Sequence, residues 1–263
     1  MKKYKNNIYI SATISTILLL VVISSILLFK FNRSIQSPVD DNHNSISDTN
    51  YNDLYSDFRK YKKTVKLHVP FTRQYPELPR GCEVTSLAML FNYNKKNISK
   101  ITLASEIKKD TTKKIVKNGQ IYFGNPNEGY VGNMYSLSHP GYGVYVKPIE
   151  TLTKKYFPNT TVNLTGKRFE DLKFFISKGN PVWVITNTTF KKLPTSEFET
   201  WNTKQGKINI TYKEHSVIVT GYDSNYVYIN DPLAERPNKK VPKQNFIDAW
   251  VQMGSQALTI SND

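Results

Sequence analysis

Cysteine is almost absent from this sequence, whose 263 residues include only Cys82. A single thiol excludes an internal disulfide framework and a cysteine-rich zinc site. We expect neither a cofactor nor a bound metal. Aromatic residues are plentiful by contrast, at 13%, and indicate a packed globular domain.

Acidic residues are scarce relative to basic ones, with 21 Asp and Glu against 36 Lys and Arg and a net charge of +15. Such a basic balance is typical of proteins with an acidic neighbour, such as nucleic acid, anionic lipid or an anionic cell-envelope polymer. The lysines occur in scattered pairs without a recognised nucleic-acid motif, so no nucleic-acid partner is expected. A solvated lysine-rich surface is the simpler interpretation, and an envelope polymer is the alternative.

Charge is missing altogether from Ile8 to Phe29, a run that lysines precede and Lys30 closes. At about 1.5 Å per helical residue, this run is long enough to cross the hydrocarbon of a bilayer. It lacks the small-x-small site at which a secretory signal peptide is cleaved. We therefore predict a single-pass signal anchor in residues 1–33 of a cell-membrane protein, with the body outside. Secretion after signal-peptide cleavage is the alternative.

The rest of the chain divides into a linker and one domain. Residues 34–63 are rich in Ser, Asn and Asp and indicate a flexible linker. Residues 64–263 show no internal repeat, and their helical patterns gather in the first half while antiparallel strands dominate the second. This order predicts an α+β fold. Beyond helices after Gly81 and Ser99, we expect helices at 149–157, 169–177 and 245–253, strands at 161–164, 181–186, 208–212, 215–221, 226–231 and 257–260, and a polar connection at 188–206.

Cys82 begins the central predicted helix. Apolar residues follow it at helical spacing, namely Val84, Leu87, Ala88 and Phe91. A thiol in the first turn of a helix lies beside unpaired N–H groups and the positive end of the macrodipole, which lower its pKa. This placement favours a nucleophilic thiolate, and the alternative is a small buried hydrophobic residue. Glu83 opposes thiolate formation by its own charge unless its side chain turns outward or pairs with a cation such as Arg80. The helix end and a nearby imidazolium are expected to outweigh it, so that a thiolate–imidazolium pair dominates near neutral pH.

A histidine and a carboxylate are expected to meet on a hairpin downstream. His215 opens one strand, and Asp231 closes the next. Side chains alternate across a strand, so the length of the turn decides whether Asp231 or Asn230 faces His215. Burial favours a three-residue turn, because that register gathers four apolar side chains on one face. These are Val217, Val219, Val227 and Ile229. In this register Asp231 accepts a hydrogen bond from the His215 Nδ1–H.

Several short motifs occur along the chain in an order that is typical of one family. They are Gln74 with Leu78-Pro79, Gly81-Cys82-Glu83 with Thr85-Ser86, Glu214-His215-Ser216-Val217, Gly221-Tyr222-Asp223 and Asn230-Asp231-Pro232. From Thr64 to Ile260 the chain resembles the C39-like, papain-fold cysteine peptidases of Gram-positive bacteria. The resemblance implies a papain-like fold with Cys82 as nucleophile, His215 as base and Asp231 as orienting acid. It also implies an oxyanion hole formed by the Gln74 side chain and the Cys82 backbone N–H.

These patterns together predict a membrane-anchored, extracytoplasmic cysteine peptidase. It would hydrolyse an amide bond of a peptide or protein through a thioester acyl-enzyme. Two alternatives remain open: a cell-wall peptide amidase or endopeptidase with the same triad, and a catalytically inactive peptide-binding module. The chain carries no ATPase motif or multispan region, so leader-peptide cleavage coupled to export is not supported.

Overall fold

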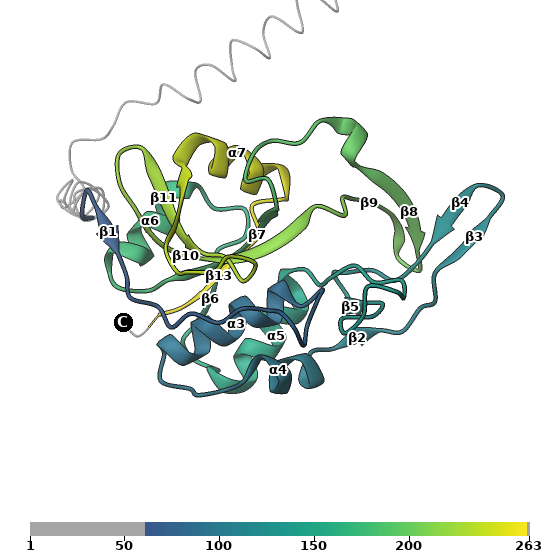
Figure 1. The fold of residues 1–263 in the computed structure, drawn as a ribbon, viewed down its shortest axis with the longest axis horizontal. Helices are drawn as coiled ribbons and strands as arrows, with labels where there is room; N and C mark the ends of the chain where they lie inside the picture. The colour runs from purple at the N-terminus through teal and green to yellow at the C-terminus, as the bar shows by residue number, and fades with distance from the viewer. Residues whose placement is uncertain (1–60, 262–263) are drawn as a thin grey trace, which may run out of the picture. The chain divides into compact units, whose positions relative to one another are not determined.

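A computed structural model describes residues 61–261 (Figure 1). The helices are α3 (Cys82–Tyr93), α4 (Lys100–Glu106), α5 (Val146–Tyr156), α6 (Phe169–Ser177) and α7 (Lys243–Gln252), with a 3-10 helix at Thr195–Glu197. The strands are β1 (Val65–Lys66), β2 (Lys109–Asp110), β3 (Ile115–Lys117), β4 (Gln120–Tyr122), β5 (Tyr130–Val131), β6 (Thr161–Asn163), β7 (Val182–Asn187), β8 (Glu199–Thr203), β9 (Gly206–Ile210), β10 (Glu214–Tyr222), β11 (Tyr226–Asn230), β12 (Lys239–Pro242) and β13 (Ala257–Ile260). The predicted α+β class is confirmed.

A seven-stranded sheet forms the centre of the domain. Its strands follow the order β12-β11-β10-β7-β13-β6, and β1 adds to β10. All of these neighbours pair antiparallel. Strand β7 lies in the middle, and all six of its residues are buried. The uninterrupted apolar run at residues 181–186 is explained by this position, because both faces of β7 are covered by helices.

Helices cover the two faces of this sheet (Figure 1). One core packs α3, α4 and α5 against Trp183, Ile185 and Ile218. The other packs α6 and α7 against the alternate residues of the same strands, such as Val182, Val184 and Val217. Helix α3 is buried along its first ten residues rather than along one stripe, because it lies between the sheet and the other helices. The amphipathic helix expected after Gly81 is thus wholly internal.

A second sheet lies beside this body and was not predicted. It has the order β3-β4-β8-β9 and includes the segment that the sequence pattern indicates as a polar connection. Trp201 of β8 is buried against the rings of Phe123 and Tyr142, at centroid distances of 5.3 and 5.2 Å. A lone tryptophan among polar residues gives little periodicity. Its strand forms because β9, the next strand along the chain, pairs with it on one side and β4, from a distant segment, on the other.

The predicted membrane span from Ile8 to Phe29 lies outside the described residues, as does nearly all of the predicted linker. Among the helices of residues 61–261, none is long and apolar enough to cross a membrane. Tyr61 and Lys62, at the end of the predicted linker, pack on the domain. The Tyr222 hydroxyl donates a hydrogen bond to the Lys62 carbonyl at 2.7 Å, and the Tyr61 and Tyr222 rings meet edge to face.

Candidate active site

Cys82 is the first residue of α3, as the sequence predicts. Gly81 precedes it, and a Cβ at that position would lie 2.6 Å from the Leu78 Cβ, so only glycine lets the chain enter the helix here. The Cys82 side chain lines a cavity of about 230 Å³ that opens to solvent. Gln74, Glu214 and His215 line the same cavity, which therefore brings together most of the predicted site.

The surroundings of the thiol oppose ionisation. Cys82 Sγ donates a hydrogen bond to Glu83 Oε2 at 3.4 Å. Burial raises the pKa of Cys82 well above its ordinary value, and the charges of Glu83 and Glu214 raise it further. Burial is the largest of these effects, and together with the carboxyls it outweighs the partial positive charge of the helix end. The expectation of a lowered thiol pKa is therefore wrong for this arrangement.

Glu83 neither turns outward nor pairs with Arg80, so neither arrangement that would relieve its effect on the thiol is present. Its side chain is fully buried, and Oε1 accepts a hydrogen bond from the Val144 backbone N–H at 2.7 Å. Arg80 instead donates hydrogen bonds to backbone carbonyls of the loop that includes Leu137 and His139. Burial raises the pKa of Glu83 to about 7. The carboxyl points inward because it satisfies a backbone donor of a distant segment, which the local sequence does not reveal.

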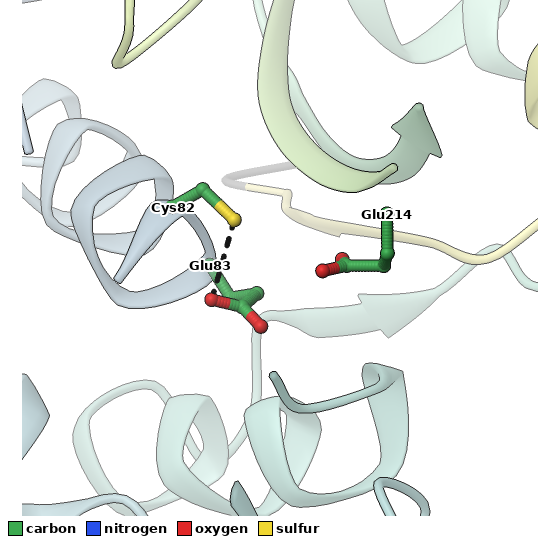
Figure 2. Close-up of side chains that lie close together, drawn as sticks. All are labelled: Cys82, Glu83 and Glu214. Atoms are coloured by element: carbon green, nitrogen blue, oxygen red, sulfur yellow. Dashed lines mark hydrogen bonds between the residues drawn. The ribbon is translucent and has the colours of Figure 1, made fainter. Parts of the chain in front are cut away.

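Glu214 is a site residue to which the sequence pattern assigned no role. Its carboxylate points toward Cys82 and Glu83 (Figure 2). Burial, followed by the charge of Glu83, raises the pKa of Glu214 well above its ordinary value. Strand alternation explains the position: Ile218 belongs to the core on the α3 side, so Glu214 and Ser216 face α3 as well. The sequence contained the information needed to find Glu214, because it immediately precedes the predicted His215 and strand alternation places it on the opposite face.

His215 and Asp231 meet as the register argument predicts. His215 Nε2 lies 2.8 Å from Asp231 Oδ1, and both residues are buried. The ring nitrogen that faces Asp231 is Nε2, so the expected use of Nδ1 is corrected. In the described part of the chain, His215 Nδ1 has no hydrogen-bond partner, and it remains available to a group in the cavity.

Asp231 has further partners that hold it in the ionised form. Lys239 Nζ donates to Oδ2 at 2.8 Å, and the Leu233 N–H donates to Oδ1 at 2.9 Å. Burial by itself raises the pKa of Asp231, but the hydrogen bonds from His215 and Lys239 outweigh burial and hold the pKa well below its ordinary value. Sequence reasoning missed Lys239, which belongs to one of many lysine pairs and carries no distinguishing pattern.

The hairpin register agrees with the prediction at the site and departs from it near the turn. Residues 223–225 join β10 to β11, and Val219 pairs with Ile229 as a three-residue turn requires. A bulge between Val219 and Gly221 then shifts the register, so that Tyr222 pairs with Val227. Asn230 lies on the other face, where its Nδ2 donates to the Val69 carbonyl at 3.1 Å.

Gln74 is buried beside the cavity, on the segment before α3. Its Nε2 donates a hydrogen bond to the Pro79 carbonyl at 2.8 Å, which leaves a second amide proton. Its Oε1 is buried and has no partner among the described residues.

No hydrogen bond joins Cys82 Sγ to the His215 ring within residues 61–261; the thiol bonds to Glu83 instead. The two residues come from opposite sides of the central sheet. Cys82 belongs to α3, on one side, whereas His215 lies on the same face of β10 as Val217, which packs in the core of α6 and α7 on the other side. They meet only at the cavity that both line. For His215 to accept the thiol proton, Cys82 must leave its hydrogen bond to Glu83.

Comparison with known proteins identifies the family of the chain. The model of the Peptidase_C39 like family matches residues 66–258. The chain is 39% identical over 255 residues to the uncharacterized protein YvpB of Bacillus subtilis (strain 168), covering 94% of this chain and 98% of that protein. A crystal structure of a candidate C39-like peptidase from Bacillus anthracis is 49% identical, with a TM-score of 0.71, and the match covers 77% of this chain and 99% of the other.

The family match spans both α3 and the β10–β11 hairpin, and so includes every residue of the cavity that the sequence pattern singled out. With a papain-like arrangement of helices packed on an antiparallel sheet, this chain belongs to the Peptidase_C39 like family.

Proposed function

We propose that this protein is a cysteine peptidase that hydrolyses an amide bond through Cys82, His215 and Asp231. The observation that carries the proposal is the orientation of His215. Asp231 holds its Nε2, while no residue of the described chain pairs with Nδ1 in the cavity that contains the Cys82 thiol. A base held at one nitrogen and free at the other is the arrangement that nucleophilic catalysis by a thiol requires.

The reaction follows from this orientation. His215 Nδ1 takes the thiol proton, and Cys82 Sγ attacks the carbonyl carbon of the substrate. The imidazolium then donates its proton to the leaving amine, and a thioester remains. A water molecule, deprotonated by His215, attacks the thioester and releases the carboxylic acid and the thiol. Asp231 stabilises the imidazolium through its ionised carboxylate, which Lys239 supports.

The oxyanion would form at the start of α3. The first N–H groups of a helix have no partner within the helix, and the Cys82 N–H is one of them. The second amide proton of Gln74 Nε2 is the other proposed donor. We place the reaction outside the cell membrane, with residues 1–33 as the anchor, and take a peptide or protein as the substrate.

A fluorogenic peptide library tests the proposal. The full-length wild-type protein is expected to cleave members of the library, and mass spectrometry is expected to detect a thioester on Cys82 after rapid acid quench. Cys82→Ala should abolish both signals, whereas Asp248→Asn, a surface carboxylate on α7, should change neither. Cleavage that persists in Cys82→Ala would refute the assignment.

One observation favours a second function, an inactive peptide-binding module. Burial raises the pKa of the thiol, and the thiol is hydrogen-bonded to Glu83 rather than to His215. A binding module would retain peptides from the library without cleaving them, and Cys82→Ala would bind them equally well.

The excess of basic residues in the chain would also suit an anionic cell-wall substrate, cleaved by the same three residues.

A further inference from the structure

Three buried groups converge behind the cavity. Sγ of Cys82 and carboxylate oxygens of Glu83 and Glu214 all lie within 4.8 Å of one another (Figure 2). Each residue is buried. A thiol and two carboxyls in contact form a set of potential anions, and buried charges are ordinarily paired.

Positive charge is missing from this cluster. None of the ion pairs formed by residues 61–261 involves Glu83 or Glu214. Apart from the thiol, the partners of the Glu83 carboxylate in this part of the chain are neutral backbone N–H groups, those of Val144 and of Glu83 itself. The cluster therefore brings together acidic groups without a counter-ion from residues 61–261.

Glu214 provides an independent indication that a partner is missing. The residue is 8% exposed, and its Oε1 is buried without any hydrogen-bond partner in the described structure. Buried side-chain oxygens nearly always have a partner. The backbone is also shaped around these carboxylates, because a Cβ on Gly143 would lie 2.3 Å from Glu83 Oε1 and 3.0 Å from Glu214 Oε2.

The spacing of the groups suits a small thiophilic cation. Bonds of about 2.3 Å to sulfur and 2.0 Å to oxygen at a tetrahedral angle place the two ligand atoms about 3.5 Å apart. Cys82 Sγ and Glu83 Oε2 are 3.4 Å apart. A substrate ammonium group fits less well, because solvent does not reach Glu214 Oε1 and the Glu83 side chain is completely buried.

We propose that Cys82, Glu83 and Glu214 form a zinc site that inhibits the protein by coordinating the thiol. Thiolate sulfur and carboxylate oxygen are both zinc ligands, and a water molecule completes the tetrahedron. Each ligand that is protonated beforehand releases its proton to solvent when the ion binds. Zinc bound at Sγ occupies the electron pair that would attack a substrate, so binding and catalysis exclude each other.

Cobalt(II) and zinc titrations of the full-length protein test this proposal without relying on peptidase activity. After treatment with reductant and chelator, addition of Co²⁺ should produce the near-ultraviolet charge-transfer absorption of a cobalt–thiolate bond. Zn²⁺ should abolish this absorption, and calorimetry should show a single zinc site per chain. Cobalt binding without the charge-transfer band would overturn the proposal, since Cys82 is the only cysteine.

Two variants separate the site from adventitious binding. Cys82→Ser should remove the cobalt–thiolate band, and Glu214→Gln should weaken zinc binding about 100-fold. Glu106→Gln, which alters a carboxylate paired with Lys155 at the surface, is the matched control and should bind as wild type does. Equal zinc affinity in Glu214→Gln and Glu106→Gln, with both folded by circular dichroism, would refute the site.

The activity assay tests inhibition separately. Zinc at saturating concentration should abolish cleavage of the peptide library, and a chelator should restore it. Full activity with zinc bound would refute inhibition through Cys82. If the protein cleaves no peptide at all, the proposed function fails while the cobalt spectrum still decides the metal site.

Discussion

At the scale of the residue, the environment of Cys82 combines opposing electrostatic effects. The start of α3 favours the thiolate, and an imidazolium at His215 would favour it more. Burial and two neighbouring carboxyls oppose it and raise the pKa of the thiol. Burial is the largest of these effects, and the carboxyls within 4.8 Å of Sγ add to it, so the neutral thiol is favoured in the free protein.

This balance predicts how the reactivity of Cys82 responds to Glu214. With metal removed by a chelator, iodoacetamide should alkylate wild-type Cys82 more slowly at neutral pH than it alkylates a free thiol, because a raised pKa lowers the thiolate fraction. Glu214→Gln removes the negative charge that Glu214 acquires as it ionises, and so should increase the rate at the alkaline pH where wild-type Glu214 is charged. Rates measured across pH should shift to lower pH in the variant. An unchanged profile, with Glu106→Gln as control, would contradict the electrostatic account.

The hydrogen bond between His215 and Asp231 predicts a loss of catalysis. Asp231→Asn retains the shape of the side chain but removes the charge that stabilises the imidazolium. We expect kcat to fall by about 10²-fold to 10⁴-fold. Circular dichroism should show a folded variant, and alkylation of Cys82 should still proceed. Wild-type kcat in a folded Asp231→Asn protein would exclude Asp231 from the proposed triad.

Asp231 also predicts how stability depends on pH. Its pKa is lower in the folded protein than in the unfolded chain, so its contribution is present above the unfolded value of about 3.9. The contribution is lost as the pH falls through the folded pKa. Urea unfolding should therefore show Asp231→Asn to be less stable than wild type at neutral pH, by more than about 1.4 kcal/mol. The difference should shrink below about pH 4, and a constant difference would contradict this linkage.

At the scale of the element, the β10–β11 hairpin shows how a register is defined. At the end of the hairpin near His215, one pairing register buries the apolar side chains on a single face, and the registers shifted by one residue do not. The pairing of Val219 with Ile229 therefore follows from the sequence pattern. Nothing in the pattern specifies the bulge after Val219. It adjusts β10 where the strand must also accept β1, which pairs with Gly221 and Tyr222.

The close approach of β1 to β10 predicts a cost for a side chain at Gly221. A Cβ there would lie 2.1 Å from the Val65 carbonyl oxygen, a backbone atom that cannot move without breaking the pairing. Gly221→Ala should lower the free energy of unfolding by about 1–3 kcal/mol. Ser224→Ala, in the turn of the same hairpin, should leave it nearly unchanged. Chemical denaturation compares the two variants, and equal stability would show that β1 moves aside freely.

At the scale of the whole molecule, the first prediction concerns location. The uncharged run from Ile8 to Phe29 predicts that the full-length protein fractionates with membranes and resists extraction by salt. Deletion of residues 1–33 should release it into the soluble fraction. If a shortened wild-type protein accumulates in the culture medium instead, the run is a cleaved signal peptide.

The sequence by itself determined the features that depend on local periodicity. Helical spacing after Gly81 placed Cys82 at the start of α3, and strand alternation placed Asp231 beside His215. The main helices lie within a few residues of their predicted ranges, and the family follows from motifs in a particular order. These features are local because hydrogen bonds within a helix and alternation along a strand involve residues close in the chain.

Only the tertiary structure decided the surroundings of the thiol. Glu83 turns inward because it bonds to Val144, and Glu214 reaches Cys82 because β10 packs under α3. Trp201 lies in a strand because β4, from a distant segment, pairs with β8, and its ring packs on Phe123 and Tyr142. Each contact joins segments that are distant in sequence, and side-chain direction there is set by burial and unpaired backbone donors rather than by local propensity. The charge around Cys82 is therefore a property of the fold, although its position in the helix is a property of the sequence.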